Sequence, residues 1–150
     1  MDARSSYREA DVRGASPVRL VVLLYEQMIL DLTRAVQAME RHDIESRTRE
    51  INHAITVIGF LQGTLNIEQG GQVAANLLRF YHTLRTALME AQARASKQVL
   101  ADQIACLLDV REAWLEIEKI EVEKSAANSP QQSRTSITTV ESHAPKVWNG

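Results

Sequence analysis

The sequence contains one cysteine, Cys106, so no disulfide bond can form within the chain. A lone cysteine also cannot supply a paired metal-binding or redox motif. Cys106 lies among apolar residues in a helical pattern, and we expect its side chain to be a small buried hydrophobic group. The cysteine content therefore argues against a disulfide-stabilised scaffold and against thiol chemistry.

Long apolar runs are absent as well. No segment approaches the ~20 consecutive apolar residues that span a bilayer. The first residues lack the apolar stretch of a secretory signal peptide. We therefore expect a cytoplasmic protein that does not insert into membranes.

Neither sign of charge dominates, because 17 basic residues stand against 19 acidic ones. No run rich in arginine and lysine is present to neutralise a line of phosphates. The charge distribution argues against nucleic acid as a partner.

Aromatic residues make up only 5% of the chain, whereas good helix formers such as Ala, Leu, Glu, Gln and Arg are plentiful. Apolar residues recur at steps of three and four in four segments, as on one side of a helix. Helix caps are expected at Ser16, Asp43 and Ser96, and Gly70-Gly71 is expected to open the third helix. The predicted helices are 17–41, 43–65, 71–93 and 97–124.

Four such helices joined by short turns predict an all-α protein, an antiparallel four-helix bundle. A length of 150 residues fits one domain, here residues 16–124. Residues 1–15 are polar and precede it. After Lys124 the composition turns to Ser, Thr, Asn, Gln and Pro, which predicts a disordered tail over residues 125–150.

Few residues form a pattern that is typical of a catalytic or metal site. Glu50 and His53 match one Glu-x-x-His pair of a di-iron bundle, but a second pair is absent, so we expect no metal. His53 and His82 are candidates for a histidine phosphotransfer bundle, although neither has the Lys and Gly neighbours typical of one. We expect no enzyme and no cofactor, and keep phosphotransfer as the weaker alternative.

The fourth helix carries more apolar surface than one neighbour can cover. One stripe consists of Leu100, Ile104, Leu107 and Trp114. A second stripe, about a third of a turn away, consists of Val99, Cys106, Val110, Ala113, Ile117 and Ile120. Three uses of this surplus remain open: a broad core, a homodimer, or a groove for a partner's amphipathic helix.

Three blocks of the sequence together resemble the flagellar export chaperone FliS family. The first is Ala15-Ser16-Pro17, Leu20 and Leu23-Leu24-Tyr25-Glu26. The second is Leu61, Leu65, Gly70-Gly71, Val73-Ala74, Asn76-Leu77 and Tyr81. The third is Leu107-Leu108 and Arg111-Glu112-Ala113-Trp114. They cover roughly residues 7–118 in the family's order, while Asn66 and Gln72 stand where acidic residues are commoner.

The resemblance implies a cytosolic four-helix bundle that binds the C-terminal segment of flagellin, prevents its early polymerisation and passes it to the export gate protein FlhA. It implies no catalysis. An anti-sigma factor or a FliW-type assembly factor is a further possible partner. We expect the free protein to be a monomer or a weak homodimer.

The residues that we expect to bind a partner are Tyr7, Val12, Leu20, Tyr25, Met28, Leu77, Tyr81, Val110, Trp114 and Ile117. By the resemblance, Tyr7 and Val12 belong to an N-terminal lid that lies across the bundle until the client displaces it. For Tyr81 and Trp114, core and groove positions are equally compatible with the sequence.

Overall fold

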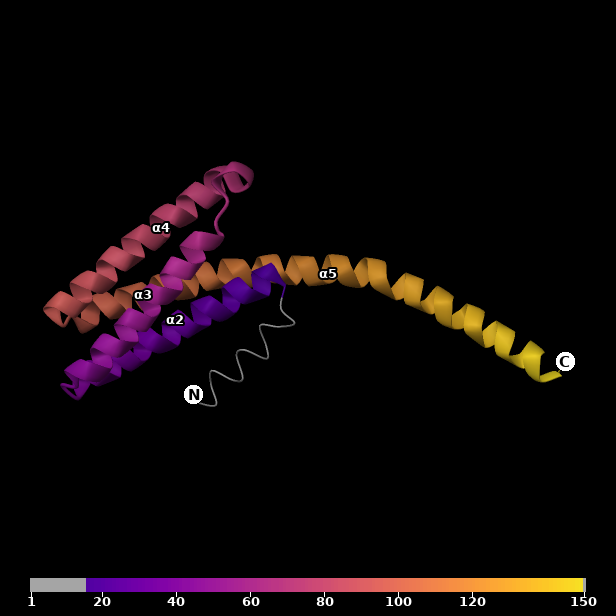
Figure 1. The fold of residues 1–150 in the computed structure, drawn as a ribbon, viewed down its shortest axis with the longest axis horizontal. Helices are drawn as coiled ribbons and strands as arrows, with labels where there is room; N and C mark the ends of the chain where they lie inside the picture. Colours follow the sequence, from indigo (N-terminus) through magenta and orange to yellow (C-terminus); the bar gives the residue numbers. More distant parts are fainter. Residues whose placement is uncertain (1–15, 150) are drawn as a thin grey trace. The chain divides into compact units, whose positions relative to one another are not determined.

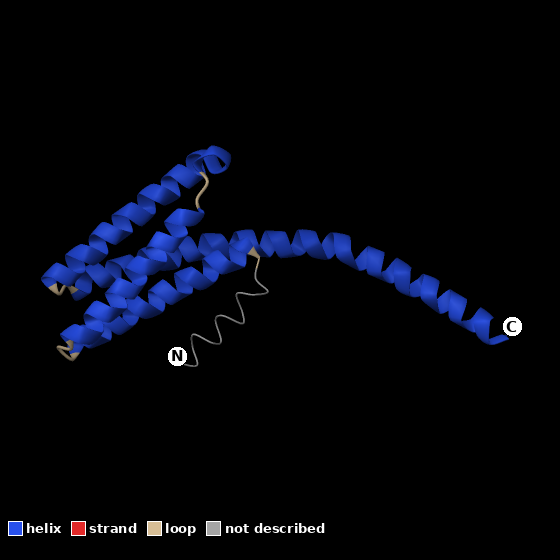
Figure 2. Ribbon diagram, in the orientation of Figure 1, coloured by secondary structure: helices blue, strands red, loops and turns tan. Residues whose placement is uncertain are grey.

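The computed structural model describes the backbone of residues 16–149 and the side chains of residues 16–128. The described backbone forms four helices: α2 (Pro17–Glu40), α3 (Ile44–Thr64), α4 (Ile67–Arg94) and α5 (Lys97–Asn149) (Figures 1 and 2). It falls into two units, one ending at Trp114 and the other beginning at Leu115. The predicted lid, with Tyr7 and Val12, lies outside the described residues.

The first unit is an antiparallel four-helix bundle, which confirms the predicted fold. Helices α2, α3 and α4 and the part of α5 up to Trp114 reverse direction at each short turn (Figure 2). Their apolar sides enclose one core. Its largest fully buried side chains are Tyr25, Tyr81, Met28, Leu32, Ile51, Ile58, Leu61, Leu84, Leu88, Leu100, Leu107 and Val22.

Side-chain oxygens cap three of the helices at the predicted positions. The Ser16 hydroxyl accepts a hydrogen bond from the Arg19 amide at 3.1 Å. The Asp43 carboxylate accepts one from the Ser46 amide at 3.0 Å. The Ser96 hydroxyl accepts one from an amide in the first turn of α5, that of Val99, at 3.2 Å. Each cap satisfies an amide that would otherwise lack a partner within the helix.

Helix α4 begins at Ile67, earlier than the predicted 71, because Asn66 caps a first turn through the Gln69 amide. The double glycine then breaks the helical geometry. Gly71 has φ 56°, which side chains disfavour. A Cβ on Gly70 would lie 2.6 Å from the Cβ of Ala74. Both glycines are therefore required by this bend.

One buried carboxylate lies in the core between α2 and α3. Asp31 is 0% exposed. Its Oδ1 accepts a hydrogen bond from Gln27 Nε2 at 2.7 Å, and its Oδ2 contacts His53 Nδ1. A buried carboxylate is costly without such partners, so His53 and Gln27 hold this charged group in the core.

Helix α5 differs from one prediction. Cys106 is exposed rather than buried, because Leu100 and Leu107 on the other stripe face the core. The helix runs to Asn149, and the disorder predicted from the composition of residues 125–150 stays a prediction. Residues 121–128 are all exposed, so this stretch is held by its own backbone hydrogen bonds and not by a core.

Among the described helices, none combines the length and the apolar character needed to cross a membrane.

Candidate partner-binding site

Two tyrosines from different helices meet in the core. The hydroxyl oxygens of Tyr25 on α2 and Tyr81 on α4 lie 2.8 Å apart, and the rings pack edge to face with centroids 6.2 Å apart. Trp114 on α5 is a further neighbour of Tyr25 and packs against the same core. The two tyrosine hydroxyls therefore join α2 to α4 by a hydrogen bond inside the core.

The environment of these phenols favours their neutral form. Burial raises the pKa of the Tyr25 hydroxyl, an effect opposed in part by the neighbouring polar groups of Tyr81 and Trp114. Burial also raises the pKa of Tyr81, and the neighbouring Tyr25 adds to that rise. The pair is consequently a hydrogen-bonding element rather than a source of phenolate.

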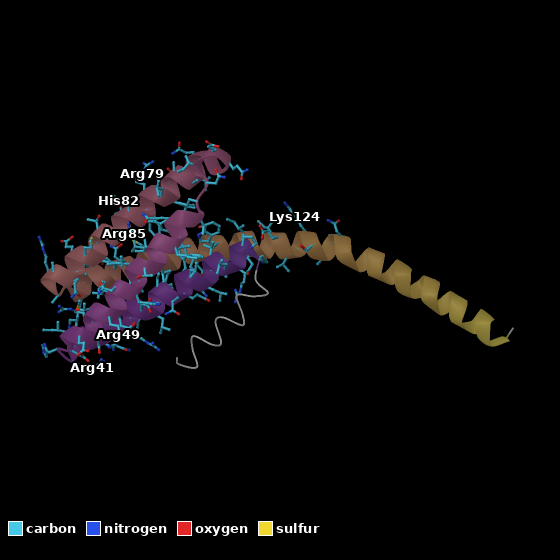
Figure 3. All side chains as sticks on the ribbon, viewed as in Figure 1. Arg41, Arg49, Arg79, His82, Arg85 and Lys124 are labelled. Carbon is cyan, nitrogen blue, oxygen red and sulfur yellow. The ribbon has the colours of Figure 1, made fainter. Side chains whose placement is uncertain are left out.

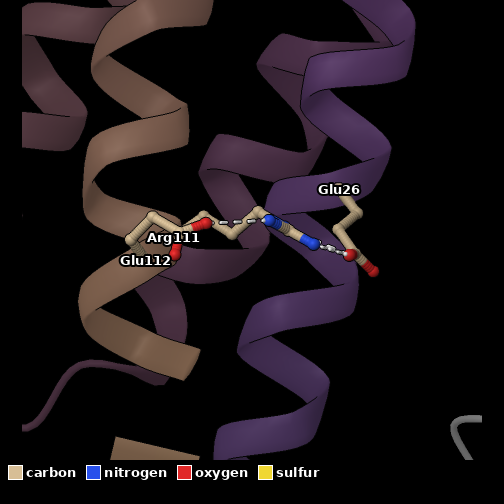
Figure 4. Close-up of polar contacts among 3 residues, drawn as sticks. All are labelled: Glu26, Arg111 and Glu112. Carbon is tan, nitrogen blue, oxygen red and sulfur yellow. Dashed lines mark hydrogen bonds and ion pairs between the residues drawn. The ribbon is translucent and has the colours of Figure 1, made fainter. Parts of the chain in front are cut away.

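A charged pair joins α2 and α5 next to these rings. Arg111 donates to Glu26 Oε2 from Nη2 at 2.6 Å and from Nε at 3.1 Å (Figure 4). Its Nη1 lies 3.3 Å from Glu112 Oε1. The Arg111 and Glu26 side chains are 25% and 29% exposed. Partial burial makes this pair stronger than a freely solvated one.

These contacts bring the three sequence blocks together. Tyr25 and Glu26 come from the first block, Tyr81 from the second, and Arg111 and Trp114 from the third. We call these five residues the motif cluster. Residues from all three blocks of the resemblance thus meet at one site of the first unit.

The structure divides the predicted site residues into two groups. Tyr25, Met28 and Tyr81 are at most 1% exposed and belong to the core. Tyr25 and Met28 therefore do not line an open surface of the described fold, and Tyr81 occupies the core position that was one of its two expected placements. Their role here is to position the helices.

The other predicted residues in the first unit keep some surface. Those that are partly exposed are Leu20, Leu77, Val110 and Trp114. Leu77 lies one helical turn before Tyr81, and Val110 lies one turn before Trp114. Leu77, Val110 and Trp114 pack against the core, as does the partly exposed Phe80. We call Leu77, Phe80, Val110 and Trp114 the apolar rim.

Ile117 belongs to the second unit, where it is 43% exposed. Like Val110, it offers apolar surface to solvent.

The family model for the flagellar protein FliS matches residues 1–121 of the chain. The chain belongs to the FliS family. The flagellar secretion chaperone FliSB of Pseudomonas aeruginosa is 38% identical over 106 residues, which cover 71% of this chain and 84% of that protein. FliS of Salmonella typhimurium is 30% identical over 110 residues, covering 73% and 82%. FliS of Bacillus subtilis is 26% identical over 110 residues, covering 73% and 81%. Membership places the chain among the flagellar secretion chaperones.

Asn66 and Gln72, the two residues expected from the sequence to depart from the family pattern, both make side-chain hydrogen bonds. Asn66 caps α4 by accepting a hydrogen bond from the Gln69 amide at 3.1 Å. Gln72 Nε2 donates to Asn76 Oδ1 at 2.9 Å, one turn further along the helix. Neither residue contacts the motif cluster, so the departures leave this site of the FliS fold unchanged.

The histidines considered for phosphotransfer occupy different settings. His53 contacts the buried Asp31 carboxylate, whereas His82 is exposed on α4. Glu50 and His53 are not joined by a third ligand, since no group of three His, Cys, Asp or Glu in the described part of the chain is placed to hold a metal. The His53 contact is structural, because it satisfies a core carboxylate.

Sequence reasoning assigned no role to Glu26 or Arg111 in the site. Glu26 directly follows Tyr25, and Arg111 precedes Trp114 by one turn. The opposite charges of Glu26 and Arg111, each close to an aromatic residue of the resemblance, are the signal that could have identified this pair.

Proposed function

We propose that this FliS-family protein binds the disordered C-terminal segment of flagellin in the cytoplasm, prevents its premature polymerisation and delivers it to the export gate protein FlhA. Membership in the flagellar secretion chaperones supports the role. The observation that carries the proposal is the apolar rim: apolar side chains that remain partly exposed beside a rigid, hydrogen-bonded cluster.

The physical argument rests on what a disordered client needs. A segment without a core of its own gains stability by laying apolar residues on a preformed apolar surface, and helices in grooves are a common form. Ordering the segment consumes commonly 2–5 kcal/mol or more of the contact energy. A rigid acceptor reduces the remaining cost, since its own side chains are already fixed.

In this proposal the motif cluster and the apolar rim have different tasks. Tyr25, Tyr81 and the Glu26–Arg111 pair fix α2, α4 and α5 relative to one another within the first unit. Leu77, Val110 and Trp114 then contact the client with their exposed parts. Leu20 at the start of α2 and Ile117 in the second unit are further proposed contacts.

Calorimetric titration of the full chain with the flagellin segment tests client binding. Val110→Asp is expected to weaken binding at least about tenfold, because it places a charge where apolar contact is needed. Leu108→Asp is the matched control: Leu108 is 42% exposed, lies on the same helix and points to a different side. Equal loss in both variants would contradict a site at the rim.

Circular dichroism of the same variants separates binding from folding. Val110 packs against the core, so Val110→Asp could also unfold the bundle. A loss of flagellin binding is therefore assigned to the rim only if this variant keeps the helicity of the parent protein. Ile117→Asp provides a second test in a residue that is largely exposed. Retained helicity with lost binding supports the proposal, whereas unchanged binding in both variants would refute these contacts.

The proposed lid is tested separately. Tyr7→Ala and Val12→Ala are expected to tighten flagellin binding if the segment masks the rim, since no displacement is then needed. Unchanged flagellin affinity and unchanged self-association would contradict the lid.

Delivery to FlhA requires its own measurement. The complex of this protein with flagellin should bind the cytoplasmic domain of FlhA more tightly than either component alone. Equal binding with and without flagellin would argue that recognition of the loaded chaperone is not the delivery step.

A further inference from the structure

Helix α4 carries a partly exposed stripe beside its core-facing residues. Leu78, His82, Arg85 and Met89 follow one another at steps of four, three and four, so they share one side of the helix. Leu78 is 39% and Met89 58% exposed. Arg79 lies beside them, and the labelled side chains of Arg79, His82 and Arg85 succeed one another along α4 in Figure 3. We call these five residues the α4 outer stripe.

The stripe is basic and its charges are not balanced locally. The acidic residues of α4 are Glu68 in its first turn and Glu90, which lies 3.4 Å from Arg94. Among the described residues, neither Arg79 nor Arg85 forms an ion pair with a carboxylate. Arg79 instead donates to the amide oxygen of Asn76 at 3.3 Å. The bundle itself therefore leaves this patch without its counter-charge.

Arg85 lies where α4 faces α3. Its Nε is buried and has no hydrogen-bond acceptor in the described part of the chain, and its Nη2 lies 3.5 Å from the position that a Cβ on Gly59 of α3 would occupy. The guanidinium is therefore held at the edge of the stripe with no described carboxylate to balance its charge.

The second unit offers the complementary chemistry. Residues 115–124 read Leu-Glu-Ile-Glu-Lys-Ile-Glu-Val-Glu-Lys, with four glutamates against two lysines. Ile117 and Ile120 are 43% and 50% exposed. By helical spacing these isoleucines share a side with Glu121, and Glu116 and Glu123 lie next to it. We call residues 115–124 the acidic segment.

We propose that the α4 outer stripe of one copy of this chain binds the acidic segment of a second copy. Leu78 and Met89 would meet Ile117 and Ile120, while the glutamates would meet the arginines. The occupant follows from charge and shape: an acidic helix with an apolar side fits a basic stripe with apolar ends. Ten residues of helix bury little area, so the association is weak and concentration-dependent.

Because the proposed contact joins opposite charges, the self-association should weaken as the salt concentration rises. The charges on both surfaces are exposed or half-buried, and screening shortens their reach from about 10 Å at 0.1 M salt to about 3 Å at 1 M. Sedimentation equilibrium of the full chain, without flagellin, should show a molar mass that rises with protein concentration and falls as salt is added. A monomer at every concentration would overturn the proposal.

Charge reversal tests the surfaces individually. Arg79→Glu with His82→Glu on the stripe, or Glu121→Lys with Glu123→Lys on the segment, should each weaken self-association at least about tenfold, because like charges then face each other. The exposed Lys97→Glu at the start of α5 is the matched control and should change nothing. Circular dichroism checks that all variants remain folded.

Combining both reversals gives the decisive readout. The chain that carries all four substitutions again has opposite charges on its two surfaces, so its self-association should recover. Self-association that survives each reversal, or that fails to recover in the combined variant, would place the contact elsewhere. Since flagellin is absent from these experiments, their outcome is independent of client binding.

Discussion

The hydroxyl oxygens of Tyr25 and Tyr81 lie 2.8 Å apart in the core, although 56 residues separate them in the chain. Both side chains are at most 1% exposed. Each hydroxyl is the hydrogen-bond partner of the other, so the loss of either one leaves a buried polar group without its partner.

Tyr25→Phe and Tyr81→Phe are each expected to cost stability. Removing either hydroxyl deprives the other hydroxyl of its partner in the core. A buried polar group without a partner costs about 1–3 kcal/mol. Urea unfolding monitored by circular dichroism measures the free energy of unfolding for each variant.

The double variant, Tyr25→Phe with Tyr81→Phe, provides the control. It should lose less stability than the two single changes added together, since the hydroxyl pair is removed as a whole. Additive losses would contradict the hydrogen bond between the two hydroxyls.

The same pair predicts a loss of stability in alkali. Burial raises the pKa of both Tyr25 and Tyr81 in the folded protein. Above the ordinary tyrosine pKa of about 10 the unfolded chain therefore binds fewer protons than the folded one. Stability from this source is fully present below that pH and falls as the pH rises further.

Comparison of the parent with the double phenylalanine variant isolates the effect of the phenols. The free energy of unfolding of the variant should fall less steeply above pH 10, while the two proteins should run parallel below it. Parallel curves over the whole range would show that these phenols do not titrate differently in the folded state.

The Glu26–Arg111 pair should contribute measurably to stability. Arg111→Ala removes two donors to one partly buried carboxylate, and hydrogen bonds to charged groups contribute about 1.5–3 kcal/mol. Arg94→Ala is the control, because Arg94 pairs with Glu90 on the surface of one helix. Such exposed pairs contribute about 0.3–0.5 kcal/mol.

A double-mutant cycle with Glu26→Ala confirms the source of the loss. If Arg111→Ala destabilises the chain equally in the presence and absence of Glu26, the arginine acts through packing and not through the pair.

His53→Ala should destabilise the bundle by about 1–3 kcal/mol, because it leaves an oxygen of the buried Asp31 carboxylate without its donor. His82→Ala changes an exposed histidine on α4 and should leave the free energy of unfolding nearly unchanged. Thermal or urea unfolding at neutral pH distinguishes them. Equal effects of the two variants would argue against a structural contact at His53.

Local sequence signals located the helices well because caps and helical periodicity act within a few residues. Ser16, Asp43 and Ser96 cap their helices where expected. The bundle followed from the apolar spacing. Helix α5 was harder, since two apolar stripes competed for the core and only the one with Leu100 and Leu107 faces it.

The contacts of the site depend on tertiary structure, so the sequence predicts them less well than it predicts the helices. A tyrosine at an apolar position has the same spacing in a core as in a groove, and only the fold shows that Tyr25 and Tyr81 face each other. Asp31 presents a similar problem. Its burial depends on His53, a residue on another helix, and no local pattern reveals that contact.

The most direct test of the proposed chaperone function is titration of the full chain with the disordered C-terminal segment of its host's flagellin, followed by calorimetry and circular dichroism. We expect binding in equal ratio with a gain in helicity, and loss of both in Val110→Asp but not in Leu108→Asp. Absence of binding at micromolar concentrations would contradict flagellin as the client.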